Sequence, residues 1–144
     1  MELDAGLAFA RDHRKAVLTT IRANGRPQLS NILYHVFDDG LIRISVTVDR
    51  AKYRNLSREP WAALHVSRED FFAYVVLEGG VELTPVATRA DDEVVQELVD
   101  YYRAAMGEHE DWAAYRDAMI AERRAIIRFS PERAYGMLPP PTAP

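Results

Sequence analysis

The alternation of apolar and polar residues at positions 41–48 constrains the fold of this chain most strongly. The segment reads Leu-Ile-Arg-Ile-Ser-Val-Thr-Val, and a period of two residues is typical of a strand that buries one face. Two more segments of strand-forming composition precede it, at 16–21 and 27–37, and the turn sequences Asn24-Gly25 and Asp38-Asp39-Gly40 separate the three. We therefore expect these three strands to pair in succession as an antiparallel meander.

The remaining segments complete a small β-barrel with helical additions. Helical character is found at residues 3–11 and 50–58. The composition of strands is found at residues 61–66, 71–84 and 124–130. Gly79-Gly80, in the middle of the longest strand, predicts a bulge or a sharp bend. A pair of helices, separated by Gly107 to Asp111, precedes the last strand. The expected class is mainly β with helices (α+β), with about six antiparallel strands.

Length and composition exclude several classes of protein. The 144 residues suit one domain, which we place at 1–137, followed by a flexible Pro-rich tail at 138–144. The absence of cysteine excludes a disulfide scaffold and a thiolate metal site, and the net charge of −4 argues against a nucleic-acid partner. The longest apolar run, 71–77, is too short to span a membrane, and the acidic N-terminus does not resemble a signal peptide. We expect a cytoplasmic protein without a membrane partner.

The junction between strand 41–48 and the following helix carries the clearest chemical signal. Ser45 and Thr47 share one face of the strand, and Arg50 and Lys52 open the helix, for which Asp49 is a suitable N-cap. Free amides at a helix N-terminus and two cations form an anion site that suits a phosphate.

The alternative for this junction is a solvated first helical turn carrying Arg50, Lys52 and Arg54. Cations at a helix N-terminus oppose the macrodipole and slightly destabilise the helix. This alternative does not explain why cations stand at that position. The residues alone leave both interpretations open.

The strand at 27–37 offers hydrogen-bonding groups. Gln28 and Ser30 share one face and Asn31 lies on the other, so the strand suits a flat heterocycle, although an ordinary edge strand with a wet face has the same pattern. The four histidines are too far apart in sequence for a recognisable zinc motif, so no metal site is predicted. Neither a nucleophile nor an acid–base pair stands out, and catalytic residues stay unassigned.

Four segments together resemble a known family. They are Gly25-Arg-Pro-Gln-Leu-Ser-Asn31, Arg50-Ala-Lys-Tyr-Arg-Asn-Leu56, Glu78-Gly-Gly-Val-Glu-Leu-Thr84 and the stretch 107–119. The set is similar to the split β-barrel flavin/deazaflavin oxidoreductases of the pyridoxamine-phosphate-oxidase-like superfamily, and more narrowly to their actinobacterial branch that depends on coenzyme F420. The resemblance covers about residues 5 to 137 and implies a six-stranded split β-barrel like that of FMN-binding proteins. The additional basic phosphate site and longer C-terminal segment of the pyridoxamine-phosphate oxidases proper are not recognisable, so that activity is not expected.

The resemblance also implies a homodimer with a cofactor site at each interface. It assigns the cofactor phosphate to Arg50 and Lys52. The other implied cofactor contacts are Ser45, Val46, Thr47 and Val48 at the ribityl chain and ring, Gln28, Ser30 and Asn31 at the ring, and Phe72 and Tyr74 as aromatic residues from either subunit. Arg123-Arg124 either reaches a polyanionic cofactor tail or lies on the surface.

The implied function is an F420-dependent oxidoreductase that transfers a hydride from the reduced deazaflavin to a small organic substrate. Two alternatives stay open. One is an FMN-binding oxidase or reductase of the same fold, and the other is a non-catalytic carrier of F420 or haem. In either redox reading the cofactor supplies the chemistry and the protein supplies position and electrostatics.

Overall fold

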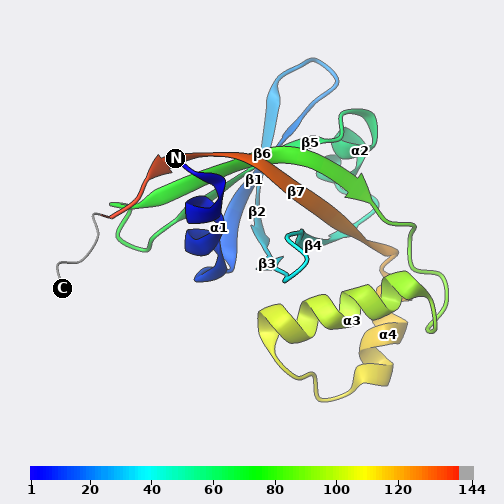
Figure 1. Ribbon diagram of the computed structural model, residues 1–144. Coiled ribbons are helices and arrows are strands. Elements are labelled where there is room, and N and C mark those ends of the chain that lie inside the picture. Colours follow the sequence, from blue (N-terminus) through cyan, green and yellow to red (C-terminus); the bar gives the residue numbers. More distant parts are fainter. Residues whose placement is uncertain (140–144) are drawn as a thin grey trace.

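The computed structural model describes residues 1–139. They form a curled antiparallel sheet of seven strands, accompanied by four helices (Figure 1). The strands are β1 (Lys15–Ile21), β2 (Pro27–Leu33), β3 (His35–Val36), β4 (Ile42–Thr47), β5 (Trp61–Ser67), β6 (Tyr74–Leu83) and β7 (Arg124–Met137). The helices are α1 (Leu3–Arg11), α2 (Ala51–Arg58), α3 (Glu93–Met106) and α4 (Trp112–Ala121). The expected α+β class and the helical pair before the last strand are confirmed. Most of the predicted tail, residues 140–144, lies outside the described residues.

The strand order in the sheet is β2-β1-β5-β6-β7-β4-β3, and every neighbouring pair is antiparallel. Alternate residues of β4 are buried, as the period of two predicts, and Ile42, Ile44 and Val46 lie in the core inside the curl. A second apolar cluster joins α3 and α4 to the sheet around Val95, Leu98 and Ile126. Burying these side chains is the main favourable contribution to folding.

The pairings of the predicted meander are present, since β2 pairs with β1 and β3 pairs with β4, but the segment 27–37 is not one continuous strand, because it is interrupted at Tyr34. This side chain is fully buried, its hydroxyl donates to the Ala10 carbonyl at 2.8 Å, and its N–H donates to the Arg14 carbonyl. The chain therefore leaves the strand at Tyr34 and continues as β3. As a result the sheet has seven strands where about six were expected, and β2 and β4 lie near opposite ends of the sheet order.

The predicted bulge is confirmed in β6. Glu78 is opposite Arg133 and Gly79 is opposite Pro131, so Glu132 of β7 is the extra residue. A Cβ on Gly79 would lie 1.9 Å from the Ser130 carbonyl oxygen, which explains why glycine is needed at this position. The irregularity occurs in two long strands, and bulges of this kind increase the bend of a sheet.

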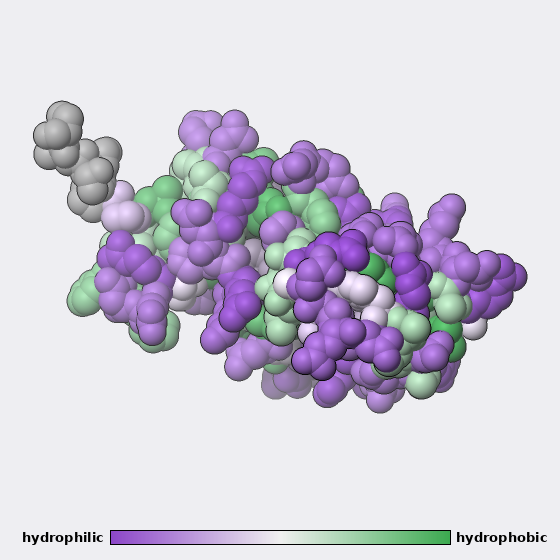
Figure 2. Space-filling view, turned by 90° about the horizontal axis from the view of Figure 1, so that it is seen from below, coloured by the Kyte–Doolittle hydropathy of each residue, from purple (hydrophilic) through white to green (hydrophobic). Residues whose placement is uncertain are grey.

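The helical pair lies beyond the end of the sheet where β6 ends and β7 begins (Figure 1). In the view from below, the surface around these helices is mostly hydrophilic, with apolar residues showing between charged ones (Figure 2). The buried residues of the pair, among them Val95, Leu98 and Tyr115, therefore lie on its inner side. None of the helices in residues 1–139 is both long and apolar enough to cross a membrane.

Candidate functional site

Helix α2 begins one residue later than the sequence suggests. Its N-cap is Arg50, and no side chain caps the helix end. Asp49, the predicted cap, instead accepts a hydrogen bond from the Thr47 hydroxyl at 2.6 Å, and its carbonyl accepts one from Arg54. The N-terminal end of α2 therefore lacks a side-chain acceptor, and Arg50 stands directly at it.

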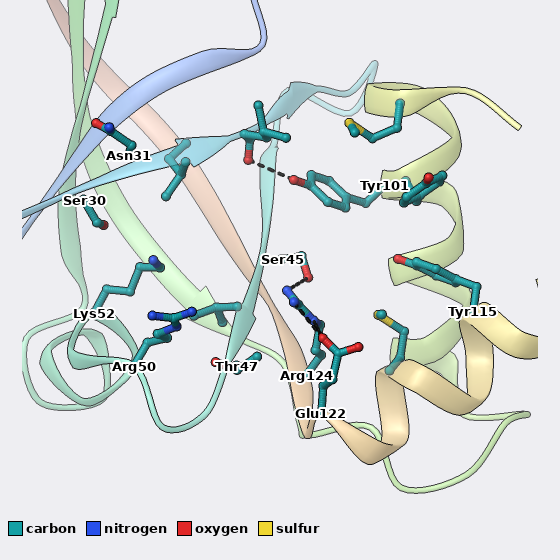
Figure 3. A pocket seen from close by; sticks show the side chains of 16 residues that line it. Ser30, Asn31, Ser45, Thr47, Arg50, Lys52, Tyr101, Tyr115, Glu122 and Arg124 are labelled. Atoms are coloured by element: carbon teal, nitrogen blue, oxygen red, sulfur yellow. Dashed lines mark hydrogen bonds and ion pairs between the residues drawn. The ribbon is translucent and has the colours of Figure 1, made fainter. Parts of the chain in front are cut away.

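A cavity of about 570 Å³ lies between this end of α2, strands β2 and β4, and the helices α3 and α4 (Figure 3). The curl of the sheet brings β2 and β4 to the same cavity although they are far apart in strand order. The sheet and α2 contribute Ser30, Asn31, Ile32, Leu33, Ser45, Val46, Thr47, Arg50 and Lys52. The other wall consists of Tyr101, Tyr102, Met106, Tyr115, Met119, Glu122 and Arg124.

Three cations line the cavity, and they are unequally neutralised. Arg124 donates to the Ser45 hydroxyl at 3.0 Å and forms an ion pair with Glu122 at 2.9 Å. Arg50 and Lys52 form no ion pair with any residue in 1–139. Burial and the nearby charges of Arg50 and Arg124 lower the pKa of Lys52. This part of the cavity therefore carries an excess of positive charge, although the Asp49 carboxylate lies near enough to Arg50 for its pKa, which the hydrogen bond from Thr47 lowers most, to be lowered in part by that charge.

One polar atom at the cavity has no partner. Among the buried side-chain oxygen and nitrogen atoms described in residues 1–139, the Ser30 hydroxyl is the one without a hydrogen-bond partner. A buried hydroxyl without a partner costs about 1–3 kcal/mol, so such a group calls for an explanation, for example a bound water, ion or ligand. Its position on the cavity wall suits a hydrogen bond to a ligand.

The opposite wall presents aromatic rings and thioethers. The hydroxyl of Tyr101 donates to the Leu33 carbonyl and that of Tyr115 to the Leu98 carbonyl, both at 2.9 Å. Burial raises the pKa of both tyrosines. Because these hydroxyls are engaged and hard to ionise, Tyr101 and Tyr115 offer packing surface rather than acid–base chemistry.

The cavity brings together most of the residues predicted for the site. Those that line it are Ser30, Asn31, Ser45, Val46, Thr47, Arg50 and Lys52. Gln28 does not line it, because its carbonyl oxygen accepts from the Thr20 hydroxyl at 3.0 Å inside the sheet. Val48 lies beyond β4, and its N–H donates to the Arg123 carbonyl.

The two predicted aromatic residues also lie outside the cavity. Phe72 is 76% exposed in the loop before β6, and Tyr74 begins β6 with its ring against His65. The predicted strand 71–84 begins only at Tyr74, because Asp70 accepts hydrogen bonds from Arg68 and from the Phe72 N–H and holds residues 68–72 in a loop.

The residues of α3 and α4 were not predicted as site residues. Tyr115 and Met119 are buried and also line the cavity. Tyr102 and Met106 are four residues apart, a spacing that equally describes the core face of a helix. Only the tertiary packing of the helical pair, on β4 and β7 and through the Tyr101 hydroxyl to β2, distinguishes a cavity wall from an ordinary core.

A comparison with protein families gives the context of this arrangement. The family model for pyridoxamine 5'-phosphate oxidase matches residues 3–138, almost the whole chain. The chain belongs to this family.

Solved structures share the fold at low sequence identity. A conserved hypothetical protein, Rv2991 of Mycobacterium tuberculosis, matches with a TM-score of 0.74 at 22% identity, over 100% of this chain and 92% of that one. An F420 reductase matches with a TM-score of 0.64 at 24% identity, over 85% of this chain and 89% of that one. HutZ, the heme storage protein of Vibrio cholerae, matches with a TM-score of 0.64 at 19% identity, over 95% and 96%. These likenesses establish the split-barrel fold.

The lowered pKa of Lys52 leads to a prediction about anion binding. We expect the affinity for sulfate, whose charge is constant in this range, to fall with rising pH at values below 10.5, the ordinary pKa of lysine, because Lys52 loses its charge there. Calorimetric titration from neutral to alkaline pH measures this. In the matched variant Lys52→Arg the guanidinium stays charged, so this pH dependence should disappear. A wild-type affinity that stays constant up to pH 10.5 would contradict the assignment.

Proposed function

We propose that this protein binds coenzyme F420 in the cavity and acts as an F420-dependent oxidoreductase on a small organic substrate. The observation that carries the proposal is the pair Arg50 and Lys52, two cations without an ionic partner in residues 1–139 at a cavity of about 570 Å³. A phosphate would supply the missing negative charge. The similarity in fold to an F420 reductase supports this choice of cofactor.

The residues of the cavity fit such a group in size and chemistry. Its volume lies within the range of about 300–1,000 Å³ that is usual for small-molecule sites. Arg50 and Lys52 would hold the phosphate, the hydroxyls of Ser45 and Thr47 would bind polar groups of the ribityl chain, and the partnerless hydroxyl of Ser30 would bind the ring system.

The protein's part in the reaction would be binding and orientation. When bound, the reduced deazaflavin supplies a hydride. The chain would hold the ligand through its phosphate and restrict its motion between the sheet and the aromatic wall of α3 and α4, which raises the effective concentration of the reacting groups. The carboxylate that lines the cavity, Glu122, is held in an ion pair with Arg124, and Lys52 is assigned to the phosphate. Protons would then come from solvent.

We further propose that the working unit is a homodimer. The strand registers place Asn31, Val17, His65, Val76 and Tyr135 in one row across five strands, on the face away from the core. A hollow of about 590 Å³ on this face shares Asn31, Ile32 and Leu33 with the cavity. A second copy seated there would lie directly beside the cofactor, and Phe72 and Tyr74 would reach the site from that copy.

The loop beside this face supplies the test of the dimer. Phe71 is 80% exposed and has a φ of +66°, a strained conformation for a large side chain, and Phe72 is almost as exposed. We expect the wild-type protein to sediment as a dimer, and the double variant Phe71→Ser with Phe72→Ser to sediment as a monomer at the same micromolar concentration. A monomeric wild type would contradict the dimer.

Catalysis itself is tested by single-turnover and steady-state oxidation of reduced F420. We expect the absorbance of oxidised F420 to return when reduced F420, the protein and a panel of enones, quinones and other unsaturated carbonyl compounds are mixed. If F420 binds tightly and no acceptor is reduced, the protein is a carrier and the proposed reaction is wrong.

A further inference from the structure

Helix α2 carries a polar stripe on the side that faces the sheet. Lys52, Asn55 and Arg58 follow one another at intervals of three residues, so they lie along one side of the helix. Lys52 lines the cavity, while Asn55 is 7% exposed and packs into the sheet. The rotation that buries Asn55 therefore also directs Lys52 to the cavity.

A chain of hydrogen bonds joins Asn55 to two strands. The Asn55 side-chain amide donates to the hydroxyl of Thr20 at 3.1 Å, and that hydroxyl donates to the side-chain oxygen Oε1 of Gln28 at 3.0 Å. The Gln28 amide in turn donates to the Leu29 carbonyl. Thr20 is fully buried on the inner side of β1, so the chain crosses from α2 through β1 to β2.

Arg58 closes the other end of the chain. One of its terminal nitrogens, Nη2, donates to the Asn55 side-chain oxygen at 3.2 Å and to the Ile21 carbonyl at 2.8 Å. Both hydrogen-bonding ends of the Asn55 amide are therefore occupied, and a rotation of α2 would break at least two of these bonds. Apolar side chains in the same space would not fix the rotation of α2 about its axis, whereas a polar network with every hydrogen bond made specifies one arrangement.

We propose that Thr20 and Asn55 are positioning residues that set the rotation of α2 and thereby place the Lys52 ammonium group at the cavity. Neither residue lines the cavity. The proposal rests on the proposed function only in that the ligand held by Lys52 is a phosphate-bearing cofactor. It also accounts for Gln28, which was expected at the cofactor ring and instead completes the chain.

The variant Thr20→Val tests the proposal, because valine keeps the shape of threonine and removes its hydroxyl. We expect the affinity for F420 to fall about fivefold to tenfold, the amount that one or two hydrogen bonds contribute. The affinity for the phosphate-free deazaflavin riboside should change less than twofold. Thr20→Ser restores the hydroxyl and should restore the ratio of the F420 affinity to the riboside affinity to its wild-type value. Ser57→Ala, which removes an exposed hydroxyl of α2 that bonds to the Tyr53 carbonyl, is the matched control and should leave both affinities unchanged.

Equal loss of both affinities in Thr20→Val would show a general structural role and overturn the proposal. If Thr20→Val does not fold, the variant Arg58→Met replaces it, because Arg58 is exposed and its loss weakens the same chain of hydrogen bonds. This variant should lower the ratio of the F420 affinity to the riboside affinity by a smaller factor.

A ligand-free measurement separates this inference from the proposed function. In an NMR titration of the Lys52 ammonium group, we expect the pKa of Lys52 to lie below 10.5 in the wild type and to move back toward that value in Thr20→Val. An unchanged pKa would overturn the positioning role even if the wild type bound no F420. Failure of F420 to bind, together with the expected change in pKa, would overturn only the proposed function.

Discussion

Replacing Arg50 and Lys52 together by alanine should nearly abolish the binding of F420. A hydrogen bond to a charged group contributes about 1.5–3 kcal/mol, so losing one from each residue would weaken binding about 10²- to 10⁴-fold. The loss should be large because the third cation at the cavity, Arg124, is already paired with Glu122 and hydrogen-bonded to Ser45. Fluorescence titration of the wild type and the double variant measures the effect.

A control with the same change in net charge distinguishes contact from long-range attraction. Arg26, in the turn between β1 and β2, and Arg89, in the loop before α3, are exposed and do not line the cavity. The double variant Arg26→Ala with Arg89→Ala should bind F420 within about threefold of the wild type at physiological salt, because exposed charges are screened over about 8 Å. Equal losses in both double variants would contradict the phosphate assignment.

Glu97→Gln should cost about 3 kcal/mol of unfolding free energy. The Glu97 carboxylate bridges Arg43 on β4 and Arg128 on β7, with a distance of 2.7 Å to each. Its side chain is 14% exposed, and removing this carboxylate leaves Arg43 and Arg128 with only the more exposed Asp39 and Glu82 as ionic partners. Glu97 lies one turn before Tyr101, so the same bridge holds the aromatic wall of the cavity. Urea unfolding of the two proteins measures the difference.

The matched control for this variant is Glu82→Gln. Glu82 also pairs with Arg128, but its side chain is 71% exposed, so its loss should cost less than about 1 kcal/mol. If the two variants lose equal stability, the partly buried bridge at Glu97 contributes no more than an exposed ion pair, which would contradict this prediction.

Glu97 also contributes to the pH dependence of stability. Burial alone would raise its pKa, but the hydrogen bonds from Arg128 and Arg43 outweigh this and hold the pKa of Glu97 below its ordinary value of 4.5. Since the unfolded chain then binds the proton more readily, this contribution is complete above pH 4.5 and is lost as the pH falls through the lowered pKa. The acid-induced loss of stability should be correspondingly smaller in Glu97→Gln.

Local patterns were sufficient to predict most of the elements. The alternation at 41–48 indicated β4, and the two glycines at 79–80 indicated the bulge in β6. Both are properties of a few neighbouring residues, the backbone conformation they allow and the face they bury. The break between β2 and β3 depended instead on Tyr34, whose burial against Ala10 is a contact between residues far apart in sequence. No pattern within 27–37 distinguishes such a residue from one that continues a strand.

The same limit applies to the cavity. Its cationic end was predicted because Arg50 and Lys52 follow a strand directly, and the structure places both at the cavity. Its aromatic wall was missed because Tyr102, Met106 and Tyr115 lie on helices that reach β2 and β4 only through tertiary packing. Gln28 has a side chain that could bind a heterocycle, yet its side-chain oxygen already accepts a hydrogen bond from the buried Thr20.

The most direct test of the proposed function is a pair of titrations of the purified wild-type protein, one with F420 and one with FMN. The two ligands share the ribityl phosphate, so Arg50 and Lys52 would hold either, and the comparison isolates the preference for the rest of the molecule. We expect F420 to bind at least tenfold more tightly than FMN, a difference of about 1.4 kcal/mol. Binding of FMN far more tightly than F420 would contradict the assignment and make the protein an FMN-binding member of the family.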